Sequence, residues 1–301
     1  TLFRSPAIAE RHDEVVAALE AGPHDLVDAG PAGLAHWSFG QGPALVLVHG
    51  WPLHGATWRE LVPWLMDQFT CHVFDMPGVG RSRWPEGEPV GLWPNARAIH
   101  AAIESLGLER YALVAHDSGA TIARLIVTLD PDRVVGLVMG NTEIPGHVPR
   151  AFVLGQKLAR IPGATSLMGA VARSKRWQRS ALGFGDAFVD PAWLEGDFHD
   201  WFIAPLHESP AHREGQLRYV RGIEWDVVRD LDEAHRQIEA PVLMIWGERD
   251  QLFPLELARP MVTSFAGPAR LETLPEASLF VHEELAEDFA ALARPFLEEL
   301  L

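Results

Sequence analysis

Short apolar runs alternate with helix-like segments along the first half of the chain. The runs at 44–49, 70–75, 111–115 and 134–139 are almost continuously apolar, as expected for strands that are covered on both faces. A further strand is predicted at 33–39. Together these segments predict a buried, mostly parallel central sheet.

Three segments outside these strands have the periodicity of helices. Residues 7–21 mix apolar and charged positions, and a second helix is predicted over 93–106. A third helix is predicted over 57–66, with Thr57 as its N-cap and a kink at Pro63. The alternation of strands and helices predicts an α/β fold in which helices flank the sheet.

The pattern changes after about residue 143. Glycines, prolines and tryptophans interrupt the sequence, and no clear buried strand is present, so we expect a helical insertion. The strand pattern resumes later, at 241–247 and 269–274, and a last helix is predicted from about 284 to the C-terminus. The predicted parts are a first core segment with an N-terminal helix (1–143), a helical cap (144–239) and a second core segment (240–301).

The sequence Ala115-His116-Asp117-Ser118-Gly119 joins a predicted strand to a predicted helix. Small residues two positions before and after Asp117 fit the sharp strand–turn–helix of a nucleophile elbow. A structural acid has no need of such a strained turn. If Ser118 were the central residue, His116 would take a position that requires a small side chain. The spacing therefore favours Asp117 as the nucleophile.

The composition excludes some classes of partner. The 301 residues carry 25 Lys and Arg against 41 Asp and Glu, a net charge of -16, which argues against a nucleic-acid ligand. The single cysteine, Cys71, excludes an intrachain disulfide. No long apolar span or signal pattern is present, so we expect a cytoplasmic protein with no membrane partner.

Three further motifs accompany the elbow. His49-Gly50-Trp51-Pro52 is similar to the His-Gly-x-Pro turn of epoxide hydrolases, and Gly78-Val-Gly-Arg-Ser82 resembles a loop of the same family. Trp246-Gly-Glu-Arg-Asp250 resembles the strand end that supplies a triad acid. With the order of elements, these motifs resemble the α/β-hydrolase fold with a helical cap insertion. The resemblance is to the aspartate-nucleophile branch of epoxide hydrolases, haloalkane dehalogenases and haloacetate dehalogenases.

The resemblance implies a role for each motif. Asp117 would attack an electrophilic carbon and form an ester that water later hydrolyses. The backbone N–H groups of Trp51 and Ser118 would form the oxyanion hole. Asp250 would orient a general base, and Glu143 is a second candidate for this acid.

The base does not follow the family pattern. Relatives carry Gly-His-Phe-x-x-Glu after the last strand, whereas this chain places Leu279 at the histidine position. His282, three residues on, is either a catalytic base brought in by a remodelled loop or a histidine at the surface or at the start of a helix. Three other histidines lie near predicted site motifs but lack the local pattern of a base: His54, His116 and His147.

The resemblance to epoxide hydrolases also implies tyrosine donors in the cap. Tyr219 is the candidate donor, with packing in the cap as the alternative, and His147 or a cap tryptophan would be the second donor. Ser118 stands where haloalkane dehalogenases place Trp and haloacetate dehalogenases place Arg. We therefore predict an enzyme that opens a small, apolar epoxide through an Asp117 ester, without a cofactor or metal.

Two alternatives stay open. Leu279 favours a non-hydrolytic or binding protein on the same fold, because fold does not fix function. A haloalkane dehalogenase-like hydrolase with rearranged halide donors is the other. The expected partner is a small-molecule substrate; nucleic acid and membrane are not expected, and a homodimer is compatible with the sequence.

Overall fold

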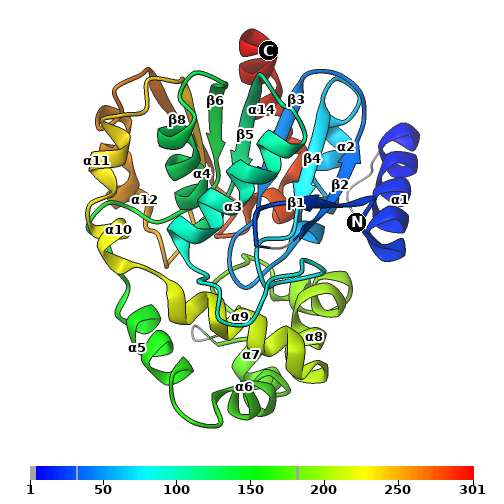
Figure 1. Cartoon of the computed structure of the whole chain (residues 1–301), viewed down its shortest axis with the longest axis vertical. Coiled ribbons are helices and arrows are strands. Elements are labelled where there is room, and N and C mark those ends of the chain that lie inside the picture. Colours follow the sequence, from blue (N-terminus) through cyan, green and yellow to red (C-terminus); the bar gives the residue numbers. More distant parts are fainter. Residues whose placement is uncertain (1–4, 32, 181–182) are drawn as a thin grey trace.

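The computed structural model describes residues 5–31, 33–180 and 183–301 of the protein. Its centre is a sheet in the order β1-β2-β4-β3-β5-β6-β7-β8 (Figure 1). The six strands β3 to β8 run parallel to one another, whereas β2 is antiparallel to both of its neighbours, β1 and β4. The strands are β1 (Asp25–Asp28), β2 (Gly33–Phe39), β3 (Ala44–Val48), β4 (Thr70–Phe74), β5 (Tyr111–Ala115), β6 (Val134–Met139), β7 (Val242–Gly247) and β8 (Ala269–Leu274).

The apolar runs of the sequence form the centre of this sheet. All residues of β5 and β7 are buried, because helices cover both faces of the sheet (Figure 1). The predicted mostly parallel sheet with flanking helices is confirmed. Strand β1 was not predicted, since only Val27 of its four residues is buried and the pattern there is weak.

Helices around the sheet agree with the sequence in most places. The predicted helix over 57–66 is wrong, because η1 and α2 are separate short helices. His54, rather than Thr57, is the N-cap of η1, and Pro63 lies in the first turn of α2 instead of causing a kink. These helices are α1 (Pro6–Ala21), η1 (Gly55–Arg59), α2 (Val62–Leu65), α3 (Leu92–Ser105), α4 (Asp117–Leu129), α12 (Leu255–Ala258), η4 (Arg259–Thr263), α13 (Val281–Glu284) and α14 (Ala286–Leu300).

The segment between β6 and β7 is helical. Figure 1 shows α5 to α9 gathered at one end of the molecule, away from the sheet. This helical insert comprises α5 (Arg150–Ala159), α6 (Ala164–Ala172), α7 (Lys175–Gln178), η2 (Pro191–Leu194), η3 (His199–Ile203), α8 (Ala204–Glu208), α9 (Pro210–Gly222), α10 (Trp225–Arg229) and α11 (Leu231–His235). In the part of the chain that the structure describes, no helix combines the length and apolarity needed to cross a bilayer.

Candidate active site

Asp117 lies in the sharp turn between β5 and α4. Its φ of 48° is in the left-handed region, which a residue other than glycine rarely adopts. The turn also requires small neighbours. A Cβ on Gly119 would lie 2.3 Å from the carbonyl oxygens of Val48 and His49, and a Cβ on Gly50 would lie 2.4 Å from Asp117 Oδ2. The structure therefore has the strained backbone that the pentad predicted.

The carboxylate of Asp117 faces the turn after β3. The backbone N–H of Trp51 donates to Asp117 Oδ2 at 2.9 Å and is 3.1 Å from Ser118 Oγ. The Ser118 hydroxyl donates to the same Oδ2 at 3.3 Å, and the Ser118 backbone N–H also faces the carboxylate. The structure thus brings Asp117, Trp51 and Ser118 together, with one carboxylate oxygen held by donors.

Burial makes the charged form of Asp117 unfavourable. Its side chain is shielded from water, which raises the pKa of the carboxyl well above its usual value, and the nearby charge of Glu143 raises it further. The donors from Ser118 and Trp51 oppose this shift without cancelling it. Conversion of the carboxylate to a neutral ester would remove the charge that burial disfavours.

Glu143 is held beside the elbow by two threonines. Thr121 donates to Glu143 Oε2 at 2.7 Å and Thr142 at 3.0 Å. The buried Arg124 donates to the Glu143 backbone carbonyl at 3.0 Å. Glu143 thus adds negative charge near Asp117, and its Oε2 accepts from two threonine hydroxyls rather than from a histidine.

Asp250 follows β7, and both of its oxygens already accept hydrogen bonds. Asn141 Nδ2 donates to Oδ2 at 2.8 Å, while the backbone N–H groups of Leu252 and Phe253 donate to Oδ1 at 2.7 and 3.1 Å. Burial still raises the Asp250 pKa to about 6. The backbone carbonyl of Asn141 accepts from the Asp117 backbone N–H at 2.7 Å, so Asn141 connects the two aspartates. No histidine among the described residues hydrogen-bonds to Asp250.

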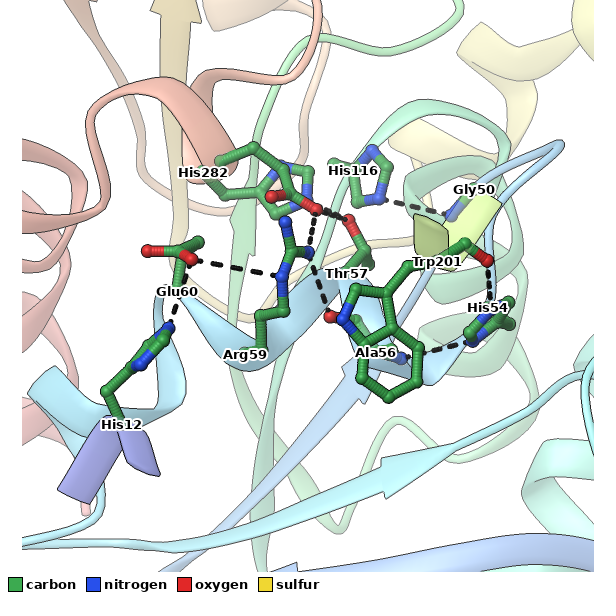
Figure 2. A network of polar contacts seen from close by, with 11 residues as sticks. His12, Gly50, His54, Ala56, Thr57, Arg59, Glu60, His116, Trp201 and His282 are labelled. Carbon is green, nitrogen blue, oxygen red and sulfur yellow. Dashed lines mark hydrogen bonds and ion pairs between the residues drawn. The ribbon is translucent and has the colours of Figure 1, made fainter. Parts of the chain in front are cut away.

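His282 forms no hydrogen bond with Asp250 and lies instead beside Thr57 of η1. Its Nε2 is 2.8 Å from Thr57 Oγ1, and its ring packs 3.9 Å from that of His116 (Figure 2). His282 does stand at the start of a helix, as the second residue of α13, but the expectation of a surface position is wrong because its side chain is fully buried. Burial lowers the pKa of His282 well below its usual value. The first turn of α13 directs the ring toward η1, so the structure does not bring His282 to Asp250.

The surroundings of His282 form a buried polar network. Glu283 accepts from Thr57 and from Arg59 Nη1, each at 2.8 Å. On the other side of the histidine pair, the Gly50 backbone N–H donates to His116 Nε2 at 3.3 Å (Figure 2). His116 therefore holds the turn that carries Trp51 through this hydrogen bond to Gly50.

Tyr219, on α9, is brought to the elbow. Its hydroxyl faces the Ser118 side chain, yet no group of the described chain completes a hydrogen bond of normal geometry with it. Burial and the charges of Glu143 and Asp117 raise its pKa well above 10, so the phenol keeps its proton. A protonated, unpaired donor therefore stands beside the candidate nucleophile.

The polar side of α9 extends beyond Tyr219. His212, Gln216 and Tyr219 recur at helical spacing, and each has a buried polar atom without a partner among the described residues. Gln216 also donates to the Pro52 carbonyl at 2.9 Å, next to the oxyanion turn. Sequence reasoning missed His212 and Gln216, although their spacing from Tyr219 was a usable signal.

The other candidate residue of the insert, His147, lies near the acid. Its Nε2 is 3.1 Å from the Leu252 carbonyl, in the loop that follows Asp250, and its side chain is half-buried. Within residues 5–31, 33–180 and 183–301, no group of three or more His, Cys, Asp or Glu side chains is arranged to hold a metal ion.

Comparison with known proteins places this geometry in a family. The family model described as "alpha/beta hydrolase fold" matches residues 43–284, most of the chain. The chain belongs to the α/β-hydrolase fold family. A pimeloyl-[acyl-carrier protein] methyl ester esterase of Vibrio parahaemolyticus is 38% identical over 275 residues, 88% of this chain and 98% of the relative. The magnesium-chelatase 30 kDa subunit of Rhodobacter capsulatus is 26% identical over 92% of both chains.

Solved structures agree on this fold. The epoxide hydrolase CorEH aligns with a TM-score of 0.76 and 21% identity, over 92% of this chain and 98% of its own. Haloalkane dehalogenases are also among the similar proteins. The protein is therefore a hydrolase-family member whose relatives include dehalogenases and esterases.

Proposed function

We propose that the protein opens a small, apolar epoxide by nucleophilic attack of Asp117. The observation that carries the proposal is the unpaired, protonated Tyr219 hydroxyl beside Ser118 and the Asp117 carboxylate. An epoxide needs both groups, because its carbon takes the nucleophile while its oxygen must receive a proton. Asp117, Trp51, Ser118 and Tyr219 supply these functions.

The first half of the reaction needs no histidine. Asp117 Oδ1 attacks an epoxide carbon, the carbon–oxygen bond breaks, and the released alkoxide takes the Tyr219 proton. Oδ2, which already accepts from Trp51 and Ser118, becomes the carbonyl oxygen of the ester. The phenolate then regains its proton from solvent as the site opens.

The second half lacks its usual base. Water must attack the ester carbonyl, and the position after β8 that would supply a histidine holds Leu279. The carboxylate oxygens of Asp250 accept hydrogen bonds from Asn141 and from two backbone N–H groups, and not from His282. General-base catalysis commonly contributes ~10²–10⁴-fold, so we propose that the Asp117 ester hydrolyses slowly and accumulates.

The helical insert (144–239) serves as the cap in this proposal. Its helix α9 carries Tyr219 and Gln216 over the oxyanion turn, and the Trp51 indole N–H donates to the Gln216 carbonyl at 3.2 Å. His147 lies close to the Asp250 loop and is the candidate for a second contact with substrate. Residues 1–143 and 240–301 form the core below it.

Intact-protein mass spectrometry tests the proposal. The protein is mixed with a panel of terminal, internal and aryl epoxides, and both the protein mass and the diol product are followed. We expect a covalent adduct of the epoxide mass that forms quickly and decays slowly. The absence of both adduct and diol across the panel would contradict the proposal.

A binding or non-hydrolytic protein is the second candidate. One observation in its favour is that the Asp250 carboxylate accepts hydrogen bonds from groups other than a histidine. The other is the raised pKa of Asp117, which suits a residue that donates and accepts protons. Leu279→His discriminates between the two. A hydrolase that lacks only its base should gain turnover, whereas a site with another purpose should not.

The dehalogenase alternative has less support from the contacts. The Trp51 indole N–H, one candidate donor for a halide, is already bonded to Gln216. Ser118 provides only its hydroxyl where haloalkane dehalogenases resemble one another in placing a tryptophan. Halide release from a varied set of haloalkanes, without epoxide turnover, would favour this alternative over ours.

A further inference from the structure

The first part of the helical insert carries a charge opposite to that of the chain as a whole. Between Glu143 and Asp186 there is no acidic residue, although the chain has 41. The same stretch contains seven of the 25 basic residues, including both lysines of the protein, Lys157 and Lys175. A local net charge of +7 therefore stands in a protein of net charge -16.

Helix α5 exposes leucines on the same side as its cations. Leu154 is 56% exposed and Leu158 is 47% exposed, and Lys157 lies between them on that side. The opposite side is buried: Gln156 donates to the Val220 carbonyl of α9 at 3.0 Å. The exposed leucines are therefore not part of the contact that attaches α5 to the insert.

The next turn and the next helix also carry exposed apolar residues. Ile161, in the turn after α5, is 43% exposed, and Leu167 of α6 is 49% exposed. Arg173 and Arg176 follow at the end of α6 and in α7. Figure 1 shows α5 and α6 at the end of the molecule that lies away from the sheet. We call these exposed residues and Lys157 the α5–α6 face.

Much of this positive charge is unpaired. Arg150, Lys157, Arg173 and Arg176 form no ion pair with any residue of the described chain. Two acids do approach from neighbouring elements: Glu195 pairs with Lys175 and Arg179, and Glu214 accepts from Thr165 and Arg221. The four free cations remain available to an external anion.

We propose that the α5–α6 face docks on an anionic lipid bilayer. Exposed leucines beside lysine and arginine are typical of helices that lie in the membrane interface, where the acyl chains take the apolar groups and the headgroups take the cations. An acidic protein would satisfy the cations but leave the leucines without a matching surface. The expected absence of a membrane partner rested on spanning and export signals, which do not bear on interfacial docking.

Co-sedimentation with vesicles tests the proposal. The full chain is mixed with vesicles of phosphatidylcholine alone or with phosphatidylglycerol. We expect binding only to the anionic vesicles, and its loss at about 0.5 M NaCl, where charges are strongly screened. Arg173→Glu/Arg176→Glu should weaken partition more than tenfold, at about fivefold per cation. Arg249→Glu/Arg259→Glu makes the same charge change elsewhere and should bind like wild type.

A second pair of variants tests the contribution of the exposed leucines to vesicle binding. Leu154→Ser/Leu158→Ser should lose binding, whereas Leu257→Ser, at a leucine that is 46% exposed outside the insert, should not. Circular dichroism confirms that each variant is folded.

A fluorescent label reports insertion directly. The single native cysteine, Cys71, is buried and its thiol pKa is raised, so Leu158→Cys can be labelled selectively. A label at 158 should shift to the blue on anionic vesicles, and one at Leu257→Cys should not. No vesicle binding at low salt, equal binding of the leucine variants, or binding to an acidic polymer without binding to vesicles would each overturn the proposal.

Discussion

Replacing Tyr219 by Phe should raise stability and lower activity at the same time. The hydroxyl is buried without a partner, and an unsatisfied buried hydroxyl costs about 1–3 kcal/mol. Phe removes that cost and fills the same space, so we expect a gain of about 1 kcal/mol, or about 2 °C in Tm. Loss of the proton donor should slow formation of the Asp117 ester by ~10²–10⁴-fold.

The other tyrosine of the chain is a matched control. Tyr111 donates to Asp130 Oδ2 at 2.8 Å, far from the elbow apex in the sheet, so Tyr111→Phe should cost about 2 kcal/mol and leave ester formation unchanged. Thermal unfolding and rapid-mixing mass spectrometry measure the two quantities. If Tyr219→Phe destabilises as much as Tyr111→Phe, or forms the ester at the wild-type rate, our reasoning about this hydroxyl is wrong.

Other changes test the elbow, the base and a buried acid. Leu279→His should raise ester hydrolysis by up to ~10²-fold in diol assays, and no gain would argue against a hydrolase that lacks only its base. Gly119→Ala should cost more than about 3 kcal/mol in denaturant unfolding because its Cβ would meet backbone at 2.3 Å, whereas Gly155→Ala, with open space, should be neutral or stabilising. Burial raises the Glu284 pKa from 4.5 to about 7, so its charged form is disfavoured in the folded protein. The contribution of Glu284 to stability should therefore fall by at most about 3 kcal/mol as pH rises from about 4.5 through 7. Glu284→Gln should remove that contribution and leave the smaller slope that comes from other buried acids such as Asp250 and Asp117; an unchanged slope would contradict the assignment.

The fold was largely predictable because its strands carry a strong local signal. The continuous apolar runs of β3, β5 and β7 reflect burial on both faces, which sequence shows directly. Segments whose conformation depends on distant contacts were harder. Thr57 has the side chain of a helix cap, but its hydroxyl instead bonds to His282 and Glu283.

The candidate site divides in the same way. The pentad and the His-Gly-Trp-Pro turn indicated that Asp117, Trp51 and Ser118 would meet, because each motif contains its own backbone geometry. The position of His282 was not predictable, since Thr57 lies 225 residues away in sequence. Tyr219 lies on a helix whose orientation over the elbow depends on packing of the whole insert.

Peptide mapping after exposure to a reactive epoxide tests the central claim most directly. The protein is quenched soon after mixing and digested, and the peptide that contains Asp117 is sequenced by tandem mass spectrometry beside an Asp117→Asn control. We predict that the epoxide mass is added to Asp117 in the wild type and is absent in the control. A modification on another residue, or an equal modification in Asp117→Asn, would contradict Asp117 as the nucleophile.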